Sequence, residues 1–431
     1  MSAWRIAHLN GVAMPADYVA KMERMYDYDV NASMPGGTLP GLNDAGRIDI
    51  KADLRGGAQF YPSRKDFEWI ATDGKSGVKP SVGSVALPFA GHLVMRTGWD
   101  PNDLYMLFDA GPYGYGHQHE DALSFVIYSH GRYQLVDAGT YAYDSSQWRQ
   151  YVISTRGHNT IRVDGLDQHR GGRPREQYVV SKPLPNKWIA GDGFDYASGV
   201  YNDGYGSKND VKVVHARSIF FVRPEYWIVT DFLTPADNKS HSYESMFHLD
   251  SPSVVADGKT ARTENIDTGN LAVIAPADDD ASLRIVTAQE KPVVQGWILK
   301  SGYEMRPLPT AIYTKEQAGP ASFQYVFFPT AKGAQCPVTG VKRLDAGTAA
   351  GMEISFQDGH TDYFVQARDN AMIKFLDFET DAEAVFVRMK DGKVVKAMLA
   401  GGTGLTRDGK QVRAEISAIQ DLSRTEQTHK F

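Results

Sequence analysis

The stretch KVVHARSIFFVRPEYWIVTDFL, residues 212–233, holds the pattern that decides the fold. Its two halves are rich in β-branched and aromatic residues, and Arg223-Pro224-Glu225 separates them. Residues of these types favour strands, and turn-forming residues between two such runs predict an antiparallel hairpin. We therefore expect an antiparallel sheet in this part of the chain.

Short strands of the same kind occur on both sides of this hairpin. Upstream, alternating runs bounded by Gly, Asp or Asn occupy 103–111, 123–129, 132–139 and 159–165, and His130-Gly131 joins the second run to the third. Downstream, similar runs are LAVIAPA, SLRIVTA, SFQYVFFP, GMEISFQ, TDYFVQA and AEAVFVRM. Many short strands with few helices between them indicate stacked antiparallel sheets. We expect a mainly β protein, a large antiparallel multi-sheet β-sandwich.

The N-terminal part has a different pattern. Residues 1–30 place apolar side chains at helical spacing, and Pro15 can open a helix. Residues 31–60 are rich in Gly, Pro, Asn and Asp, which predicts a loop. A weaker boundary near residue 340 marks a smaller C-terminal β-module. The expected domains are therefore 1–60, 61–340 and 341–431.

Composition limits the classes of function. The chain has 431 residues, 42% of them hydrophobic, and a net charge of −6, so no broad basic surface for nucleic acid is expected. Cys336 is the only cysteine, which excludes an intrachain disulfide. The N-terminus has no apolar run of signal-peptide length, and no stretch approaches the roughly 20 apolar residues of a membrane span. We expect neither nucleic acid nor a membrane among the partners.

The segment GHQHEDALSF, residues 116–125, indicates a polar site at the mouth of a hairpin. His117 and His119 are two residues apart, so in an extended chain they project to the same side. Asp137 returns along the hairpin towards them, and His158 lies at the start of another strand. Two imidazoles and a carboxylate with an open fourth position form a reasonable zinc ligand set. His119, Asp137 and His158 are therefore candidate metal ligands.

Each of these residues also has a plain structural explanation. His119 can hydrogen-bond a strand end, Asp137 can cap the turn at DAGTY, and His158 can cap the entry to a strand. Spacing alone leaves these explanations open. Three such coincidences at one sheet rim are less probable than one shared site, which favours the metal interpretation.

Four longer segments resemble one known family. GHQHEDALSF, LVDAGTYAYD, WRQYVISTRGHNTIRVDGLDQHR and VHARSIFFVRPEYWIVTDFL are similar to the C-terminal half of the heparinase II/III-like polysaccharide lyases, which include heparin lyases and oligoalginate lyases. The similarity runs in order from about residue 1 to at least residue 250. It implies an N-terminal α/α toroid followed by an antiparallel β-sandwich, and β-elimination at a uronic acid.

The resemblance also implies roles for individual residues. The zinc ligands of the family correspond to His119, Asp137 and His158, and its sandwich-side catalytic histidine corresponds to His117. The family's catalytic tyrosine and its carboxylate-neutralising residue lie in the toroid, before the segment that MPGGTLPGLNDAG resembles. Only about 30 residues precede that segment here, so they are expected to be a short helical remnant of the toroid. No position is assigned to the tyrosine.

Other side chains near the site in sequence are candidates for secondary roles. A structural zinc is preferred to a Lewis acid, because all three ligands are expected on strand ends of one sheet. Glu120 or Asp121 can orient a ligand imidazole through its second nitrogen. Trp148 can instead pack in a core, and Arg170 can instead belong to a solvated loop. The candidate substrate-binding residues are Tyr141, Trp148, Arg149, Arg156, Gln168 and Arg170.

Two functions remain open on these grounds. The first is a polysaccharide lyase, or its C-terminal portion, that acts on an acidic glycan such as alginate or a glycosaminoglycan. The second is a zinc-stabilised carbohydrate-binding or scaffold module without turnover, because the catalytic toroid is missing. A homodimer or a separate toroid domain is a possible partner. Resemblance alone places the protein in the periplasm or outside the cell.

Overall fold

The hairpin of residues 212–233 lies at the centre of the molecule. The computed structural model describes residues 2–171, 180–369 and 371–425. Strands β11 (Val213–Val222) and β12 (Tyr226–Pro235) pair antiparallel, with Val222 opposite Tyr226, which confirms the predicted hairpin and its turn. Ile219 faces one hydrophobic core, and its neighbour Phe220 faces another. The alternation of side chains along a strand thus buries both faces of this hairpin.

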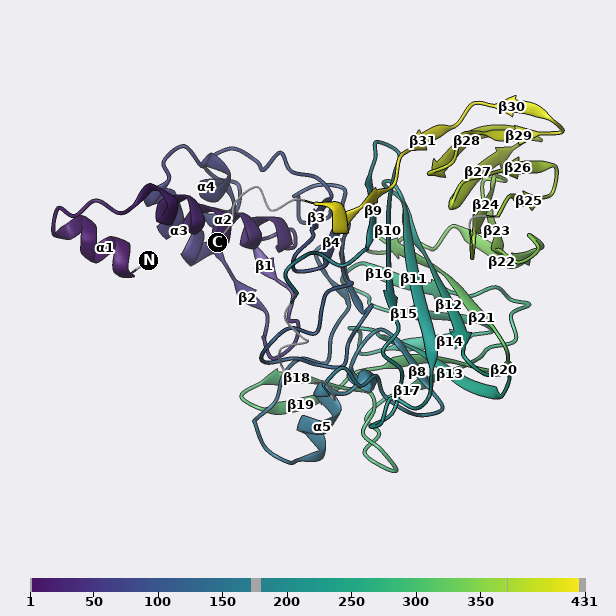
Figure 1. Ribbon diagram of the computed structural model, residues 1–431, viewed down its shortest axis with the longest axis horizontal. Coiled ribbons are helices and arrows are strands. Elements are labelled where there is room, and N and C mark those ends of the chain that lie inside the picture. The colour runs from purple at the N-terminus through teal and green to yellow at the C-terminus, as the bar shows by residue number, and fades with distance from the viewer. Residues whose placement is uncertain (1, 172–179, 370, 426–431) are drawn as a thin grey trace.

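The hairpin belongs to a nine-stranded sheet that forms the middle layer (Figure 1). All pairs within it are antiparallel. In order across the sheet, its strands are β14 (Val254–Asp257), β15 (Thr260–Thr263), β16 (Asn270–Ile274), β21 (Ala321–Thr330), β12, β11, β10 (Phe194–Tyr201), β9 (Lys187–Ala190) and β32 (Gln420–Asp421).

Two smaller antiparallel sheets cover the first face of this layer. One contains β3 (Val85–Leu87), β4 (His92–Arg96), β5 (Tyr105–Asp109), β6 (Phe125–Ser129) and β7 (Arg132–Leu135). The other contains β17 (Ser282–Val286), β20 (Thr310–Ala318), β13 (Ser240–His248) and β8 (Ile161–Val163). The three sheets meet at one aromatic cluster, in which the Phe327 ring lies 5.2 Å from Phe125 and 5.0 Å from Phe247.

The C-terminal strands cover the second face. Phe220 of β11 packs against Phe364 and Phe386 of a six-stranded sheet, at 5.3 and 6.2 Å between ring centroids. That sheet contains β22 (Val338–Leu344), β23 (Ala350–Phe356), β24 (Thr361–Gln366), β27 (Ala384–Lys390), β28 (Lys393–Ala400) and β31 (Glu415–Ser417). An outer sheet holds β25 (Ile373–Phe375), β26 (Phe378–Thr380), β29 (Leu405–Arg407) and β30 (Lys410–Val412). The protein is therefore a mainly β, multi-sheet sandwich, as expected.

Four helices gather at one end of the molecule (Figure 1). They are α1 (Ser2–Leu9), α2 (Ala16–Ala32), α3 (Lys51–Phe60) and α4 (Lys65–Ala71). The prediction of a loop over 31–60 is wrong for residues 51–60. Gly56 and Gly57 weaken the helical pattern there, yet Gly57 lets α3 approach its neighbours, since a Cβ at Gly57 would lie 3.1 Å from Tyr26. Among the described residues, no helix has the length and apolar character needed to cross a membrane.

Loops around the five-stranded sheet complete the region that matters for function. Strands β1 (Thr38–Leu39) and β2 (Ile48–Asp49) form a short pair after α2. The helix α5 (Gln147–Ile153) and the short 3-10 helix η1 (Thr155–Gly157) lie between β7 and β8. A hairpin of β18 (Trp297–Ser301) and β19 (Glu304–Pro307) lies beside α5, with Trp297 5.0 Å from Trp148. A further 3-10 helix, η3 (Leu422–Arg424), follows β32.

Candidate functional site

The three candidate metal ligands lie together in the interior. The ligand atoms of His119, Asp137 and His158 all lie within 4.8 Å of one another, and the three side chains are buried. Nδ1 of His119 lies 3.2 Å from Nε2 of His158, and that second nitrogen lies 3.3 Å from Oδ2 of Asp137. The fold therefore forms a cluster that can hold a metal ion.

Local hydrogen bonds fix the strand ends that carry these ligands. The first ligand lies in the loop between β5 and β6, the second follows β7, and the third follows η1. Asn159 joins these elements, because its side-chain amide donates to the carbonyls of Phe125 (2.8 Å) and Val136 (2.9 Å). Arg217 of β11 donates to the carbonyls of Leu123 (2.7 Å) and Asn159 (2.6 Å). The central hairpin thus supports the site from below, a role that the sequence pattern does not reveal.

The outer hydrogen bonds of the two imidazoles determine where their lone pairs point. Nδ1 of His158 lies 2.8 Å from the carbonyl of Ser154, which can only accept, so Nδ1 carries the proton. Nε2 of His119 lies 3.0 Å from Oδ1 of Asp44, which likewise makes Nε2 the donor. The remaining nitrogens therefore present lone pairs to each other and to Asp137. Three acceptors facing one another without a proton suit a cation.

Burial favours the neutral form of both kinds of ligand, which suits metal binding by His158 and opposes it at Asp137. It lowers the pKa of His158 to about 4, so this imidazole is neutral, as a metal ligand must be. Burial also raises the pKa of Asp137 well above its usual range, although the amide of Gly139 donates to Oδ1 at 2.8 Å. A bound cation would favour the ionised form of Asp137, because it supplies the opposite charge that the cluster lacks.

Asp44 is a residue of the candidate site that the sequence interpretation missed. It lies in the stretch expected to be a loop, yet its side chain is only 1% exposed and receives hydrogen bonds from His119, from both terminal nitrogens of Arg149 and from Thr140. Burial would raise the pKa of Asp44, but the hydrogen bonds from His119 and Arg149 hold it below the usual range. The only sequence signal for Asp44 is its place in MPGGTLPGLNDAG, the segment that resembles the family.

His117 lies at the surface beside this buried centre. Its side chain is 71% exposed, and its φ of +65° is a left-handed conformation that is uncommon outside glycine. Nδ1 of His117 lies 2.6 Å from the hydroxyl of Tyr143 and 3.4 Å from Oδ2 of Asp44. Tyr143 is itself exposed, and the guanidinium of Arg149 lies 4.7 Å from its ring centroid. Two exposed proton-carrying groups therefore meet directly above the carboxylate that orients His119.

The candidate substrate-binding residues are distributed around this centre. Arg149 pairs with Asp44. Tyr141 and Trp148 are partly buried and pack in a small cluster with aromatic rings of the β18–β19 hairpin. Arg156 is half-buried, and its carbonyl accepts a hydrogen bond from His248 at 3.0 Å.

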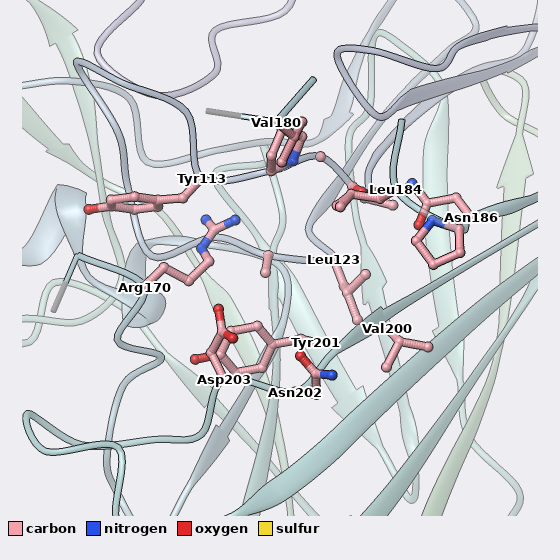
Figure 2. Close-up of a pocket in the computed structure, with 15 residues that line it drawn as sticks. Tyr113, Leu123, Arg170, Val180, Leu184, Asn186, Val200, Tyr201, Asn202 and Asp203 are labelled. Atoms are coloured by element: carbon pink, nitrogen blue, oxygen red, sulfur yellow. Dashed lines mark hydrogen bonds between the residues drawn. The ribbon is translucent and has the colours of Figure 1, made fainter. Parts of the chain in front are cut away.

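Gln168 and Arg170 lie deeper than an open binding surface would place them. The amide of Gln168 bonds both the N–H and the carbonyl of Ala122, at 2.8 and 3.0 Å. Arg170 is buried, contrary to the solvated loop considered for it, and donates to the carbonyl of His119 at 2.8 Å. Figure 2 shows Arg170 beside Tyr113 at a cavity of about 320 Å³. Both residues hold the loop that carries His119.

Glu120 and Asp121 contact Arg170 rather than a ligand imidazole. Oε2 of Glu120 accepts from the backbone N–H of Arg170 at 2.8 Å, and Asp121 accepts from its guanidinium. Burial would raise the pKa of Asp121, but Arg170, His158 and His119 lower it. The expected orienting role belongs instead to Asp44 and the Ser154 carbonyl, because they face the outer imidazole nitrogens.

Comparisons with known proteins agree on one family. The family model described as "Heparinase II/III-like, C-terminal" matches residues 79–326, and the model "Heparinase II/III N-terminus" matches residues 1–69. A heparin-sulfate lyase from Pedobacter heparinus is 29% identical over 224 residues, which are 50% of this chain and 32% of that protein. A heparin-sulfate lyase from Bacteroides stercoris is 27% identical over 240 residues, 53% of this chain and 33% of that protein.

Solved structures show the same fold. A heparan sulfate lyase from Pedobacter heparinus superposes with a TM-score of 0.67 at 22% identity, covering 87% of this chain and 55% of its own. A heparinase III superposes with a TM-score of 0.68 at 18% identity, covering 84% of this chain and 57% of its own. The matched region thus spans about a third of the curated relatives and about half of these solved structures.

Proposed function

Because the chain belongs to the heparinase II/III-like family, we propose that it provides the β-sandwich part of a polysaccharide lyase. The reaction is β-elimination at a uronic acid, and the names of its relatives favour a heparan-sulfate-type glycan as substrate. One observation supports this most strongly: exposed His117 and Tyr143 are in contact beside Asp44, which also binds His119 of a buried His-Asp-His cluster. A purely structural metal site would not need that pair at the surface.

The chemistry of elimination explains why such a pair is useful. The proton at C5 of a uronate is α to a carboxylate and leaves only with help. The carboxylate must be neutralised, a base must take the proton, and an acid must protonate the departing oxygen at C4. A neutral imidazole has one N–H donor and one acceptor nitrogen, so His117 suits carboxylate binding or proton transfer. The Tyr143 hydroxyl, 2.6 Å away, is a second proton carrier at the same edge.

We propose Zn²⁺ as the metal, held by His119, Asp137 and His158. The two imidazoles and one carboxylate are common zinc ligands. The ion would hold together the loop between β5 and β6, the segment after β7 and the segment after η1, and so it would fix the loop that carries His117. It would also keep Asp137 ionised. Its role is structural in this proposal, because the ligands are buried whereas His117 and Tyr143 are exposed.

Turnover assays test the lyase proposal. The unsaturated uronate product has its own ultraviolet absorbance band, which can be followed with heparan sulfate, heparin, chondroitin sulfate, hyaluronan and alginate. The chain should be assayed alone and joined to an α/α toroid of the family, since the resemblance places the catalytic tyrosine in that domain. If the joined protein forms no product from any of these glycans, the lyase proposal is wrong.

The same observations leave a second function open, a zinc-stabilised carbohydrate-binding or scaffold module. The candidate ligands are buried, so a bound metal could stabilise the fold without taking part in turnover, which supports this alternative. Calorimetric binding of a glycan without product, in both forms of the protein, would favour the module over the lyase. Either function implies contact with extracellular glycans, so we place the protein in the periplasm or outside the cell. Cell fractionation tests that assignment.

A further inference from the structure

A pocket with several basic residues adjoins the candidate metal cluster at Asp137. Its volume is about 410 Å³, and Asp137 forms part of its wall. The other walls come from the loop 41–47, from the strand region around Tyr133, and from the β18–β19 hairpin, which contributes Lys300 and Arg306. The pocket therefore lies where three elements that are distant in sequence meet.

Two arginines of the pocket wall, Arg47 and Arg306, share one carboxylate, that of Asp250, with Arg132, which does not line the pocket. Arg306 donates to Oδ1 of Asp250 at 2.6 Å and Arg47 donates to Oδ2 at 3.2 Å. Arg132 lies 4.0 Å from Oδ1 and also donates to the carbonyl of Asp250. One carboxylate balances only one of three guanidinium charges, and each guanidinium has five N–H donors. The arrangement leaves an excess of positive charge and of unused donors.

The remaining charges do not remove this excess. Lys300 pairs with Glu304 at 3.2 Å, and both side chains are largely exposed, so that pair is weak. Asp137 would be balanced by the metal ion. Burial lowers the pKa of Arg132; Asp250 raises it, and Arg306 and Arg47 lower it further, as expected for crowded like charges. Such a concentration of positive charge is unusual in a chain whose net charge is −6.

The pocket is close to the proposed catalytic edge. Asp44 and Arg47 are three residues apart in one loop, so their Cα atoms are at most roughly 11 Å apart. The N–H of Asp44 donates to the carbonyl of His117 at 3.2 Å. Arg47 also stacks on Tyr133, with its guanidinium carbon 4.1 Å from the ring centroid, which holds it at the pocket wall.

We propose that this pocket is a subsite for an anionic group, a sulfate or a carboxylate, on a sugar unit next to the one at His117. Arginine suits this role because its planar fork binds either oxyanion through two parallel hydrogen bonds. The inference rests on the proposed glycan substrate and adds a preference for a glycan with charge on consecutive units.

Glycan binding by charge-removed variants tests the subsite. Arg47→Gln and Arg306→Gln should each weaken binding of a heparan sulfate oligosaccharide about tenfold, measured by calorimetry at low salt. Lys300→Gln, whose exposed side chain has little influence on folding, should weaken binding in the same direction. Arg262→Gln is the matched control, because Arg262 is 48% exposed, compared with 47% for Arg47, and does not line the pocket.

Chemically desulfated oligosaccharide separates the two anions. If sulfate occupies the pocket, desulfation reduces wild-type affinity and removes the difference between wild type and the variants. If a carboxylate occupies it, the difference persists. Wild-type affinity in the folded Arg47, Arg306 and Lys300 variants, or no glycan binding by the wild type, would overturn the subsite. If the variants weaken glycan binding as expected but no assay gives product, only the lyase proposal is rejected.

Discussion

The two histidines of the HQH motif have separate environments, although one residue separates them. His119 is buried between a carboxylate and a second imidazole, whereas His117 is exposed and contacts a tyrosine hydroxyl. The left-handed backbone at His117 allows this, because it turns one side chain outward and the other inward. Simple alternation would have placed both on the same side, so the separation could not be predicted from spacing.

This difference predicts distinct effects of two alanine substitutions. His119→Ala should lose the bound metal and lower the melting temperature, since it removes a ligand from a buried cluster. His117→Ala should retain both metal and stability, because its side chain is exposed, and should reduce turnover. Metal content by mass spectrometry and thermal unfolding check both variants. Equal metal loss in the two variants would contradict the division of roles.

Asp44 leads to a second prediction. Asp44→Asn keeps the shape of the side chain but removes the charge that faces Arg149 and orients His119. Breaking a buried ion pair from one side should lower the free energy of unfolding by on the order of 3 kcal/mol and weaken metal binding. Urea unfolding and metal titration measure the two effects. The exposed pair Lys332–Asp267 offers a control, because Asp267→Asn should change neither quantity.

At the level of elements, the β11–β12 hairpin supports the site as well as the core. Arg217 of β11 lies opposite Asp231 of β12 and binds both of its oxygens, at 2.7 and 2.9 Å. His215 lies 2.7 Å from the same carboxylate. The pair holds Arg217 so that it can bind the carbonyls of Leu123 and Asn159. All three charged or titratable side chains are fully buried.

This network predicts a specific dependence of stability on pH. Burial would raise the pKa of Asp231, but Arg217 and His215 lower it to about 2, below its ordinary value. Its ionised form therefore stabilises the fold fully above about pH 4, and this contribution is lost as the pH falls towards 2. Asp231→Asn should be less stable at pH 7 by on the order of 3 kcal/mol. The difference from wild type should shrink between pH 4 and 2; a constant difference would contradict the prediction.

The elements show how far the sequence could predict the fold. Strands such as residues 123–129 and the 212–233 hairpin were predicted because β-branched and aromatic residues favour strands and turn-forming residues separate the runs. Helix α3 was not predicted, since Gly56 and Gly57 lower its helical propensity, and its packing against Tyr26, which accounts for Gly57, depends on a distant segment. The metal cluster could be proposed from residue type and order. The contacts of Asp44 and Asn159 could not be proposed in this way, because they join segments that are distant in the sequence.

At the scale of the whole molecule, four β layers are stacked in order: the two smaller sheets, the nine-stranded sheet, the six-stranded sheet and the outer sheet. The nine-stranded sheet is buried on one side by the two smaller sheets and on the other by the C-terminal sheets. The last strand of the nine-stranded sheet, β32, comes from the C-terminus and pairs with β9. The described residues of the segment 341–431, proposed as a smaller C-terminal β-module, therefore contact the central layer by both packing and strand pairing.

This arrangement predicts that the C-terminal part cannot be removed without damage. A chain that ends at Pro337 would expose apolar residues such as Phe220 and Ile228, which the six-stranded sheet covers. We expect it to aggregate, and the full chain to unfold in a single calorimetric transition. Removal of α1 is the control, because α1 adds one partly buried tryptophan, Trp4, to its cluster. A soluble, cooperatively folding truncated chain would refute the prediction.

The loop that follows α2 has a mechanical consequence. Ala32 accepts a hydrogen bond from Tyr105 of the sheet at 2.6 Å, and 12 residues later Asp44 lies between Arg149 and His119. The loop is therefore tied to the β part near both of its ends, and the placement of the helical end and the hydrogen bonds of His119 depend on this one segment.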